Sequence, residues 1–128
     1  GDPDGVLVFI DTPSMAHLTD HVLARFQTTL TPDVSARVVV LPTKRGDNPS
    51  LGRKGYDLLA GDFKYLLRMA TVMLDTMPFG GGTTSLEALA QAIPIVTLPQ
   101  RELRGRQTLK YYRLMGVYDM IAQDELEY

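Results

Sequence analysis

Short apolar runs of strand length alternate along the chain with segments whose apolar residues recur at helical spacing. The runs lie at Val6–Ile10, Arg37–Leu41, Thr71–Asp75 and Pro94–Leu98, with weaker signals at Tyr56–Leu59 and Asp119–Ala122. Helical spacing recurs in residues 15–30, 63–70, 86–93 and 111–118. This alternation predicts an α/β fold with a parallel sheet whose strands are buried on both faces under helices.

Local signals place the ends of several of these helices. Pro32 is expected to end the first helix, and Asp62 to cap the start of the helix at 63–70. Gly116 is expected near the end of the last helix. The core-facing side of that last helix is predicted from spacing to consist of Tyr111, Leu114, Met115 and Tyr118.

Length and composition exclude several kinds of protein and site. We expect residues 1–128 to form a single domain. The absence of cysteine excludes disulfides, thiolate metal sites and cysteine nucleophiles. A net charge of −2 argues against nucleic acid as a partner, and the longest apolar run is too short to span a membrane. With no signal peptide visible, we expect a cytoplasmic protein; the abrupt end at Tyr128 indicates a fragment of a longer one.

The segment from Asp75 to Glu87 is the first candidate site. Three glycines, Gly80–Gly82, run directly into a predicted helix, where free backbone amides and the positive end of the helix dipole favour an anion. Thr83 and Thr84 add hydroxyl groups. The segment is a chemically plausible phosphate cradle, although no Gly-Lys-Ser/Thr follows and it is therefore not a P-loop.

A purely structural interpretation of the same segment has about equal weight. Residues 84–87 fit a capping box, in which Glu87 would reach back to the Thr84 amide. Glu87 could instead accept hydrogen bonds from the two hydroxyls of a ribose. Both roles use the same carboxylate, so only one of them can dominate when a ligand is bound.

Other polar residues give weaker signals. Five basic residues lie in 101–113, of which Arg106 is the best functional candidate, although a solvated helix face is favoured for the group. Asp11 follows the first strand, where a turn or capping role is favoured over phosphotransfer through an aspartyl phosphate. His17 and His21 are read as ordinary helix residues, because no third metal ligand is marked, and no metal site is expected.

The central motif resembles a known family. The stretch LDTMPFGGGTTSLEAL at 74–89, followed by AIPIVTLP at 92–99, resembles the O-linked N-acetylglucosamine transferases. It is similar to the carboxy-terminal half of their catalytic region, and the pattern continues with Arg106 and residues 116–122. The resemblance covers roughly residues 62–128, whereas the first half of the chain matches only in its strand–helix order.

This resemblance implies one Rossmann-like, doubly wound half of a GT-B glycosyltransferase, the half that binds the nucleotide-sugar donor. The expected donor is UDP-N-acetylglucosamine, with no metal or other cofactor, and a protein acceptor would bind through the missing amino-terminal half. The family's diphosphate-binding threonines fall on Thr83 and Thr84, its ribose-binding acid on Glu87, and a residue near the nucleotide on Phe63. Gly82 takes a position that is often histidine, so a side-chain contact is lost there.

The chain departs from the family after the first strand. The family usually has a lysine there, which neutralises the diphosphate, whereas residues 11–15 read Asp-Thr-Pro-Ser-Met. A cation on the leaving diphosphate stabilises charge that develops in the transition state. Arg106 or a residue of the 43–55 loop could substitute for it. The alternative is a non-catalytic module that binds nucleotide sugars or another partner.

Overall fold

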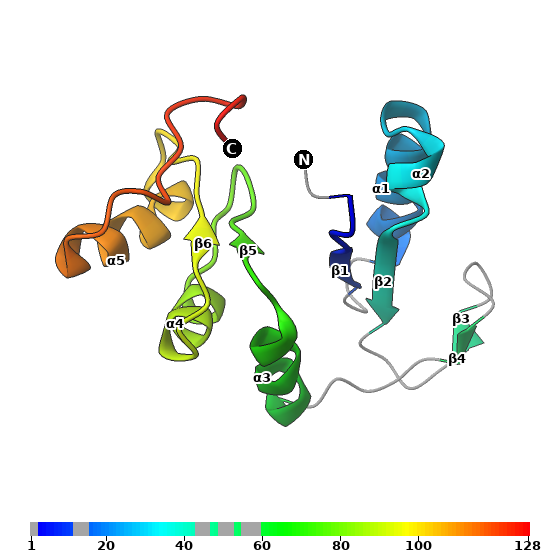
Figure 1. The fold of residues 1–128 in the computed structure, drawn as a ribbon, viewed down its shortest axis with the longest axis horizontal. Helices are drawn as coiled ribbons and strands as arrows, with labels where there is room; N and C mark the ends of the chain where they lie inside the picture. The colour runs from blue at the N-terminus through cyan, green and yellow to red at the C-terminus, as the bar shows by residue number, and fades with distance from the viewer. Residues whose placement is uncertain (1–2, 12–15, 43–46, 49–52, 55–59) are drawn as a thin grey trace. The chain divides into compact units, whose positions relative to one another are not determined.

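The main predicted helices and strands occur in the predicted order, with the additional short elements α2, β3 and β4 (Figure 1). The computed structural model describes residues 3–11, 16–42, 47–48, 53–54 and 60–128. They belong to two compact units, Gly1–Leu59 and Ala60–Tyr128. The α/β class is confirmed, while a single domain over 1–128 stays a prediction.

The first unit is built on a parallel pair of strands connected through helices. Its elements are β1 (Leu7–Asp11), α1 (Ala16–Thr29), α2 (Pro32–Ser35), β2 (Val38–Pro42), β3 (Asp47–Asn48) and β4 (Arg53–Lys54). β1 pairs in parallel with β2, whereas β3 and β4 form an antiparallel pair that the sequence did not indicate. Pro32 follows α1, as predicted, and also lies in the first turn of α2, where an amide would be unpaired anyway. The weak strand signal at 56–59 lies outside the described residues.

The predicted burial of β1 on both faces is wrong. Leu7 is 39% exposed and Val8 is 41% exposed, although Val40 of β2 is buried at 6%. A continuous apolar run indicates that a strand favours burial. Whether each face is covered depends on other elements of the fold, which the run itself does not specify. The run therefore identified the strand correctly but not its surroundings.

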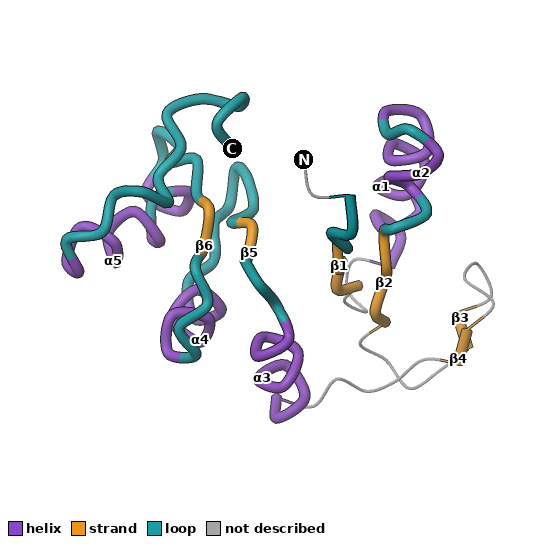
Figure 2. Tube along the Cα trace, in the orientation of Figure 1, coloured by secondary structure: helices purple, strands orange, loops and turns teal. Residues whose placement is uncertain are grey.

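The second unit carries the glycine-rich segment and has its own core. Its elements are α3 (Ala60–Met69), β5 (Met73–Leu74), α4 (Thr83–Ala90), β6 (Ile95–Val96), η2 (Leu103–Gly105, a 3-10 helix) and α5 (Gln107–Met115). β5 pairs in parallel with β6, and a single bridge joins Thr97 to Ile121 where a sixth strand was expected at 119–122. Long loops connect β5 to α4 and β6 to α5 (Figure 2).

The core of the second unit lies between α3, α4, α5 and β6. Leu67, Ala88, Ile95 and Tyr112 form its buried cluster. The backbone amide of Ile95 donates a hydrogen bond to the Tyr112 hydroxyl at 2.6 Å, so a polar group is satisfied within the apolar cluster.

The predicted core face of the last helix is also wrong. Thr108, Leu109 and Tyr112 are the buried residues of α5. By contrast, Leu114 is 78% exposed, Met115 51% and Tyr118 62%. The helix ends at Met115, with Gly116 in the left-handed region at φ 69°, so Tyr118 is not on the helix at all. Apolar spacing favoured the face with the most apolar residues. It could not indicate that Thr108 and the Tyr112 hydroxyl form hydrogen bonds inside the core.

Two further features of the architecture bear on the sequence analysis. α3 begins at Ala60, so Asp62 lies within its first turn and the predicted cap at Asp62 is wrong, because the helix extends further back than its apolar spacing. The described strands form three two-stranded ladders, β1–β2, β3–β4 and β5–β6, so a doubly wound sheet stays a prediction. Among the described helices, none combines the length and apolar character needed to cross a bilayer.

Candidate anion-binding turn and arginine-lined cavity

A buried carboxylate organises the glycine-rich turn. Asp75, directly after β5, is only 3% exposed. Its Oδ1 accepts a hydrogen bond from the Gly81 amide at 2.7 Å, and its Oδ2 accepts one from the Thr97 hydroxyl at 2.8 Å. Hydrogen bonds to an ionised acceptor are stronger than those between neutral groups and offset the cost of burying the charge. Asp75 therefore ties the turn to the end of β6.

The carbonyl of Gly81 is held from the other side of the turn. The Ser85 hydroxyl lies 2.9 Å from that oxygen and donates to it, and it also lies 3.0 Å from the Thr108 hydroxyl of α5. Because Ser85 has one hydroxyl proton, Thr108 is the donor in the second bond. Ser85 and Thr108 are both fully buried. A Cβ at position 81 would lie 2.3 Å from the Ser85 Oγ, so only glycine fits without breaking this arrangement.

The neighbouring glycines have different surroundings. The Gly80 amide donates to the carbonyl of Arg104 at 2.9 Å, which fastens the turn to η2. At Gly105 a Cβ would lie 2.7 Å from the Pro78 carbonyl oxygen, so the two segments approach closely there. At Gly82, by contrast, nothing described lies within 4 Å of an added Cβ.

The start of α4 is open to a ligand. Gly82 is the N-cap residue and provides no side-chain hydrogen bond. The amides of Gly80 and Gly81 already donate within the turn. The first amides of a helix have no partner inside it, and within the described part of the chain those of Thr83 and Thr84 receive no other acceptor. With their exposed hydroxyls and the positive end of the helix dipole, they form a site suited to an anion.

The predicted capping box is absent, which frees Glu87. α4 starts at Thr83, so Thr84 is already inside the helix and Glu87 lies too far along it to close the box. Among the described hydrogen bonds, none involves the Glu87 carboxylate, which is half-buried. Thr83 and Glu87 are four residues apart and therefore share one face of α4. The carboxylate is thus available to hydroxyl groups of a ligand held at the helix start.

Two other predicted site residues are not hydrogen-bonded to this turn. Phe63 of α3 is half-buried and packs against the core cluster. Arg106, the residue before α5, is exposed and lines a separate cavity. The structure thus brings Gly81, Gly82, Thr83, Thr84 and Glu87 together, whereas Phe63 and Arg106 each lie in a different setting.

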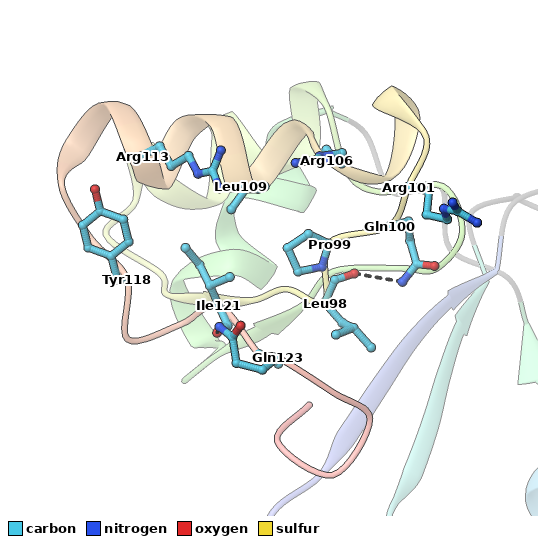
Figure 3. Close-up of a pocket in the computed structure, with 11 residues that line it drawn as sticks. Leu98, Pro99, Gln100, Arg101, Arg106, Leu109, Arg113, Tyr118, Ile121 and Gln123 are labelled. Carbon is cyan, nitrogen blue, oxygen red and sulfur yellow. Dashed lines mark hydrogen bonds between the residues drawn. The ribbon is translucent and has the colours of Figure 1, made fainter.

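That cavity has a volume of about 430 Å³ (Figure 3). Three loop or helix segments line it, at 98–101, at 106, 109 and 113, and at 118 and 121–123. Arg101, Arg106 and Arg113 are all exposed, which agrees with the solvated face favoured from sequence, but they also surround this hollow.

The sequence analysis assigned no role to the residues that fix the turn. Asp75, Ser85, Thr97 and Thr108 come from four separate segments. Asp75 carried one usable signal, since an acid directly after an apolar run and before three glycines has many amides within reach. No pattern in the sequence indicated the hydrogen bonds of Ser85 and Thr108.

Two tyrosine hydroxyls form hydrogen bonds to the backbone of the turn and of β6. The Tyr128 hydroxyl donates to the Asp75 carbonyl at 2.5 Å. Burial, together with the nearby Asp75 charge, raises the pKa of Tyr128. Burial also raises the pKa of Tyr112, and the Asp75 charge adds to it. Both phenols are therefore held in the neutral form.

Several expectations fall on residues outside the description. Residues 12–15, where the family has its lysine, and most of the 43–55 loop are among them. Asp11 ends β1, but its side chain is not described. Phosphotransfer at Asp11 and substitution of the lysine from the loop therefore stay predictions.

Comparison with known proteins shows similarity to solved structures. No protein-family model and no curated protein matches the sequence. Among solved structures, the fold is similar to part of a glycosyltransferase. One such structure is a lysine-to-methionine mutant of the O-GlcNAc transferase from Thermobaculum terrenum, with a TM-score of 0.71 and 23% sequence identity. The match covers 95% of this chain, well beyond residues 62–128, but only 21% of that protein. It establishes likeness of fold.

Proposed function

We propose that the chain is the donor-binding part of a glycosyltransferase. The complete protein would transfer N-acetylglucosamine or another hexose from a nucleotide diphosphate sugar to a hydroxyl of a protein acceptor. One observation carries the proposal: the open start of α4 is held in place by Asp75 and Ser85, while its first amides remain available. The likeness of fold to an O-GlcNAc transferase supports the class of enzyme.

In this proposal the start of α4 binds the diphosphate. The amides and hydroxyls of Thr83 and Thr84 donate to phosphate oxygens, and the helix dipole favours their negative charge. During transfer, charge builds up on the diphosphate as the bond to the sugar breaks. Donors fixed in advance stabilise that charge without having to reorganise. Asp75 is a positioning residue for this step, because it acts through Gly81 and does not touch the donor.

The remaining predicted residues would hold the nucleoside. Glu87 would accept hydrogen bonds from the ribose hydroxyls on the face of α4 that it shares with Thr83. Phe63 would pack near the base through its exposed part. The base, the sugar and the acceptor are part of the proposal, with UDP-N-acetylglucosamine as the expected donor. We also propose a cytoplasmic location, and no transferase activity for these 128 residues alone.

Titration of this chain with nucleotides tests the proposal. In two-dimensional amide NMR, UDP should give saturable shifts at residues 82–87 and at Phe63, and GDP should not. Thr84→Val removes one hydroxyl and should weaken UDP binding roughly threefold to tenfold, the usual range for one neutral hydrogen bond. Thr71→Val, at an exposed threonine remote from α4 in sequence, is the matched control. Absence of shifts with both nucleotides, or equal effects of the two variants, would contradict the proposal.

A second candidate is a non-catalytic nucleotide-sugar-binding module. The sequence observation that favours it is the absence of lysine from residues 11–15. Without that cation the leaving diphosphate loses transition-state stabilisation, although ground-state binding can persist. Assay of hexose transfer by the full-length protein distinguishes the two. Turnover supports the enzyme, and UDP binding without turnover supports the module.

A further inference from the structure

The geometry points to a second ligand site in the same unit, an arginine-lined cavity that binds a small organic anion. Its walls are the end of β6 and the loop after it, one face of α5, and residues 118–123. The cavity is lined by none of the residues from Gly80 to Glu87, so the inference does not depend on the proposed function of the turn. Its volume, about 430 Å³, lies within the usual range for small-molecule sites of roughly 300–1,000 Å³.

Charge is the first argument for an anion. Arg101, Arg106 and Arg113 line the cavity, and no acidic residue does. Within the described residues none of these three arginines forms an ion pair or a side-chain hydrogen bond with another residue, so their guanidinium groups retain their donors. A guanidinium offers donors in a planar fork that matches carboxylate and phosphate.

The spacing of the charges is the second argument. Arg113 of α5 lies seven residues after Arg106, the N-cap residue of that helix, which corresponds to about 10 Å of backbone at 1.5 Å per residue. Figure 3 shows both side chains along the same side of the helix, with Leu109 between them. An elongated ligand, or one with two acidic groups, can therefore contact both.

The apolar floor is the third argument, and it defines the body of the ligand. Leu98, Pro99 and Ile121 lie across the cavity from α5 in Figure 3. Tyr118 lies at one end, and Gln100 at the other donates its side-chain amide to the Leu98 carbonyl at 3.0 Å. Apolar surface below and cations above fit an amphipathic anion with a flat hydrocarbon part and a phosphate or carboxylate group.

Amide NMR titrations of the 128-residue chain with three probes separate the contribution of the anionic charge from that of the apolar ring. Phenyl phosphate carries both the ring and the charge, inorganic phosphate only the charge, and phenol only the ring. We expect phenyl phosphate to give saturable shifts at residues 98–101, 106–113 and 118–123, and to bind at least threefold more tightly than either of the others. Benzoate in place of phenyl phosphate then shows whether carboxylate or phosphate is preferred.

A pair of charge-removing variants tests whether the cavity itself is responsible. Arg113→Gln should weaken phenyl phosphate binding roughly threefold to tenfold, since it removes a charged donor that lines the site. Lys110→Gln removes the same charge from the exposed surface of the same helix, outside the cavity, and should weaken binding less than twofold. Equal weakening by both variants, or no saturable shift with phenyl phosphate, overturns the inference.

Arg113→Gln also distinguishes anion binding in the cavity from donor binding at the turn. Arg113→Gln should leave the UDP-induced shifts at residues 82–87 unchanged. Failure of UDP to bind, with phenyl phosphate still bound at the cavity, would remove the donor-binding proposal alone. The reverse result would remove the cavity proposal alone.

Discussion

The glycine-rich turn and the arginine cavity lie in the same unit but are built in opposite ways. In the turn, the carboxylate of Asp75 and the hydroxyls of Ser85 and Thr108 are buried and all paired. In the cavity, the arginines are exposed and carry no described ion pair. The turn offers an anion neutral donors in a fixed position, whereas the cavity offers exposed charges. Disturbing the first should therefore change stability, and disturbing the second should change ligand binding alone.

Helix α5 belongs to both regions. Its inward face places Thr108 against Ser85 and the Tyr112 hydroxyl against the Ile95 amide. Leu109 and Arg113 of the same helix line the cavity, together with Arg106 directly before it. Substitutions on the two sides of one helix can therefore test the comparison directly.

The largest effect is expected from Asp75→Ala. The substitution leaves the Gly81 amide and the Thr97 hydroxyl buried with no acceptor, which should lower the free energy of unfolding by about 3 kcal/mol. Urea denaturation followed by circular dichroism measures it. Asp119→Ala, at an exposed aspartate with no described hydrogen bond, should change the same quantity by less than about 0.5 kcal/mol. Similar values for the two variants would remove the central role given to Asp75.

Alanine substitutions at Gly81 and at Gly82 compare a buried with an open position within the turn. Gly81→Ala forces the Ser85 hydroxyl from its two hydrogen bonds and should cost about 1–3 kcal/mol, with a parallel loss of UDP binding. Gly82→Ala, one residue later in open space, loses only the preference of a helix N-cap for glycine over alanine and should cost less than about 1 kcal/mol. Denaturation and UDP titration of both variants provide the measurement. If position 82 proves as sensitive as position 81, the assigned contacts are wrong.

A smaller effect is expected on the inward face of α5. Tyr112→Phe leaves the buried Ile95 amide without its acceptor and should lower the free energy of unfolding by about 1–2 kcal/mol. Tyr111→Phe removes a hydroxyl from the same helix that has no described hydrogen bond, and should be nearly neutral. Urea denaturation again distinguishes the two. A neutral Tyr112→Phe would mean that the hydroxyl contributes packing alone.

The most gradual effect is the response to alkaline pH. Because the pKa values of Tyr112 and Tyr128 are raised above their ordinary value of 10.0, the folded state favours the neutral phenols. Their contribution to stability is therefore complete below about pH 10 and is lost as pH rises through the raised values. The free energy of unfolding should stay level to about pH 9 and then fall. The double variant Tyr112→Phe/Tyr128→Phe should show a shallower decline, and an unchanged slope would count against these assignments.

The order of helices and strands could be predicted because hydrophobic periodicity is a local property. α1 spans Ala16–Thr29 against a prediction of 15–30, and Gly116 adopts the left-handed conformation expected near the end of a helix. The inward face of α5 could not be predicted in the same way. Thr108 and Tyr112 are buried because they find Ser85 and Ile95, and nothing within α5 indicates those partners.

The open start of α4 could be predicted from the sequence, whereas the residues that fix it in place could not. Glycines followed by Thr83 and Thr84 indicate an open helix start whatever lies behind them. The fixation of that start depends on a bond between Asp75 and Thr97, 22 residues apart in sequence. The predicted capping box is absent for a related reason, since the N-cap lies at Gly82, two residues before the predicted Thr84, which moves Glu87 out of reach of the first amides.

At Gly82, the constraint imposed by folding is separated from the choice of ligand, although the two usually act on the same residue. Folding constrains residues 75, 81 and 85 through their contacts, whereas position 82 touches nothing described within 4 Å of an added Cβ. A side chain introduced there would project beside the first turn of α4. Ligand preference can therefore be engineered, or can drift in evolution, at this position while the selection that maintains folding acts elsewhere. Residue 82 is accordingly a suitable position to randomise in a library that seeks altered ligand preference.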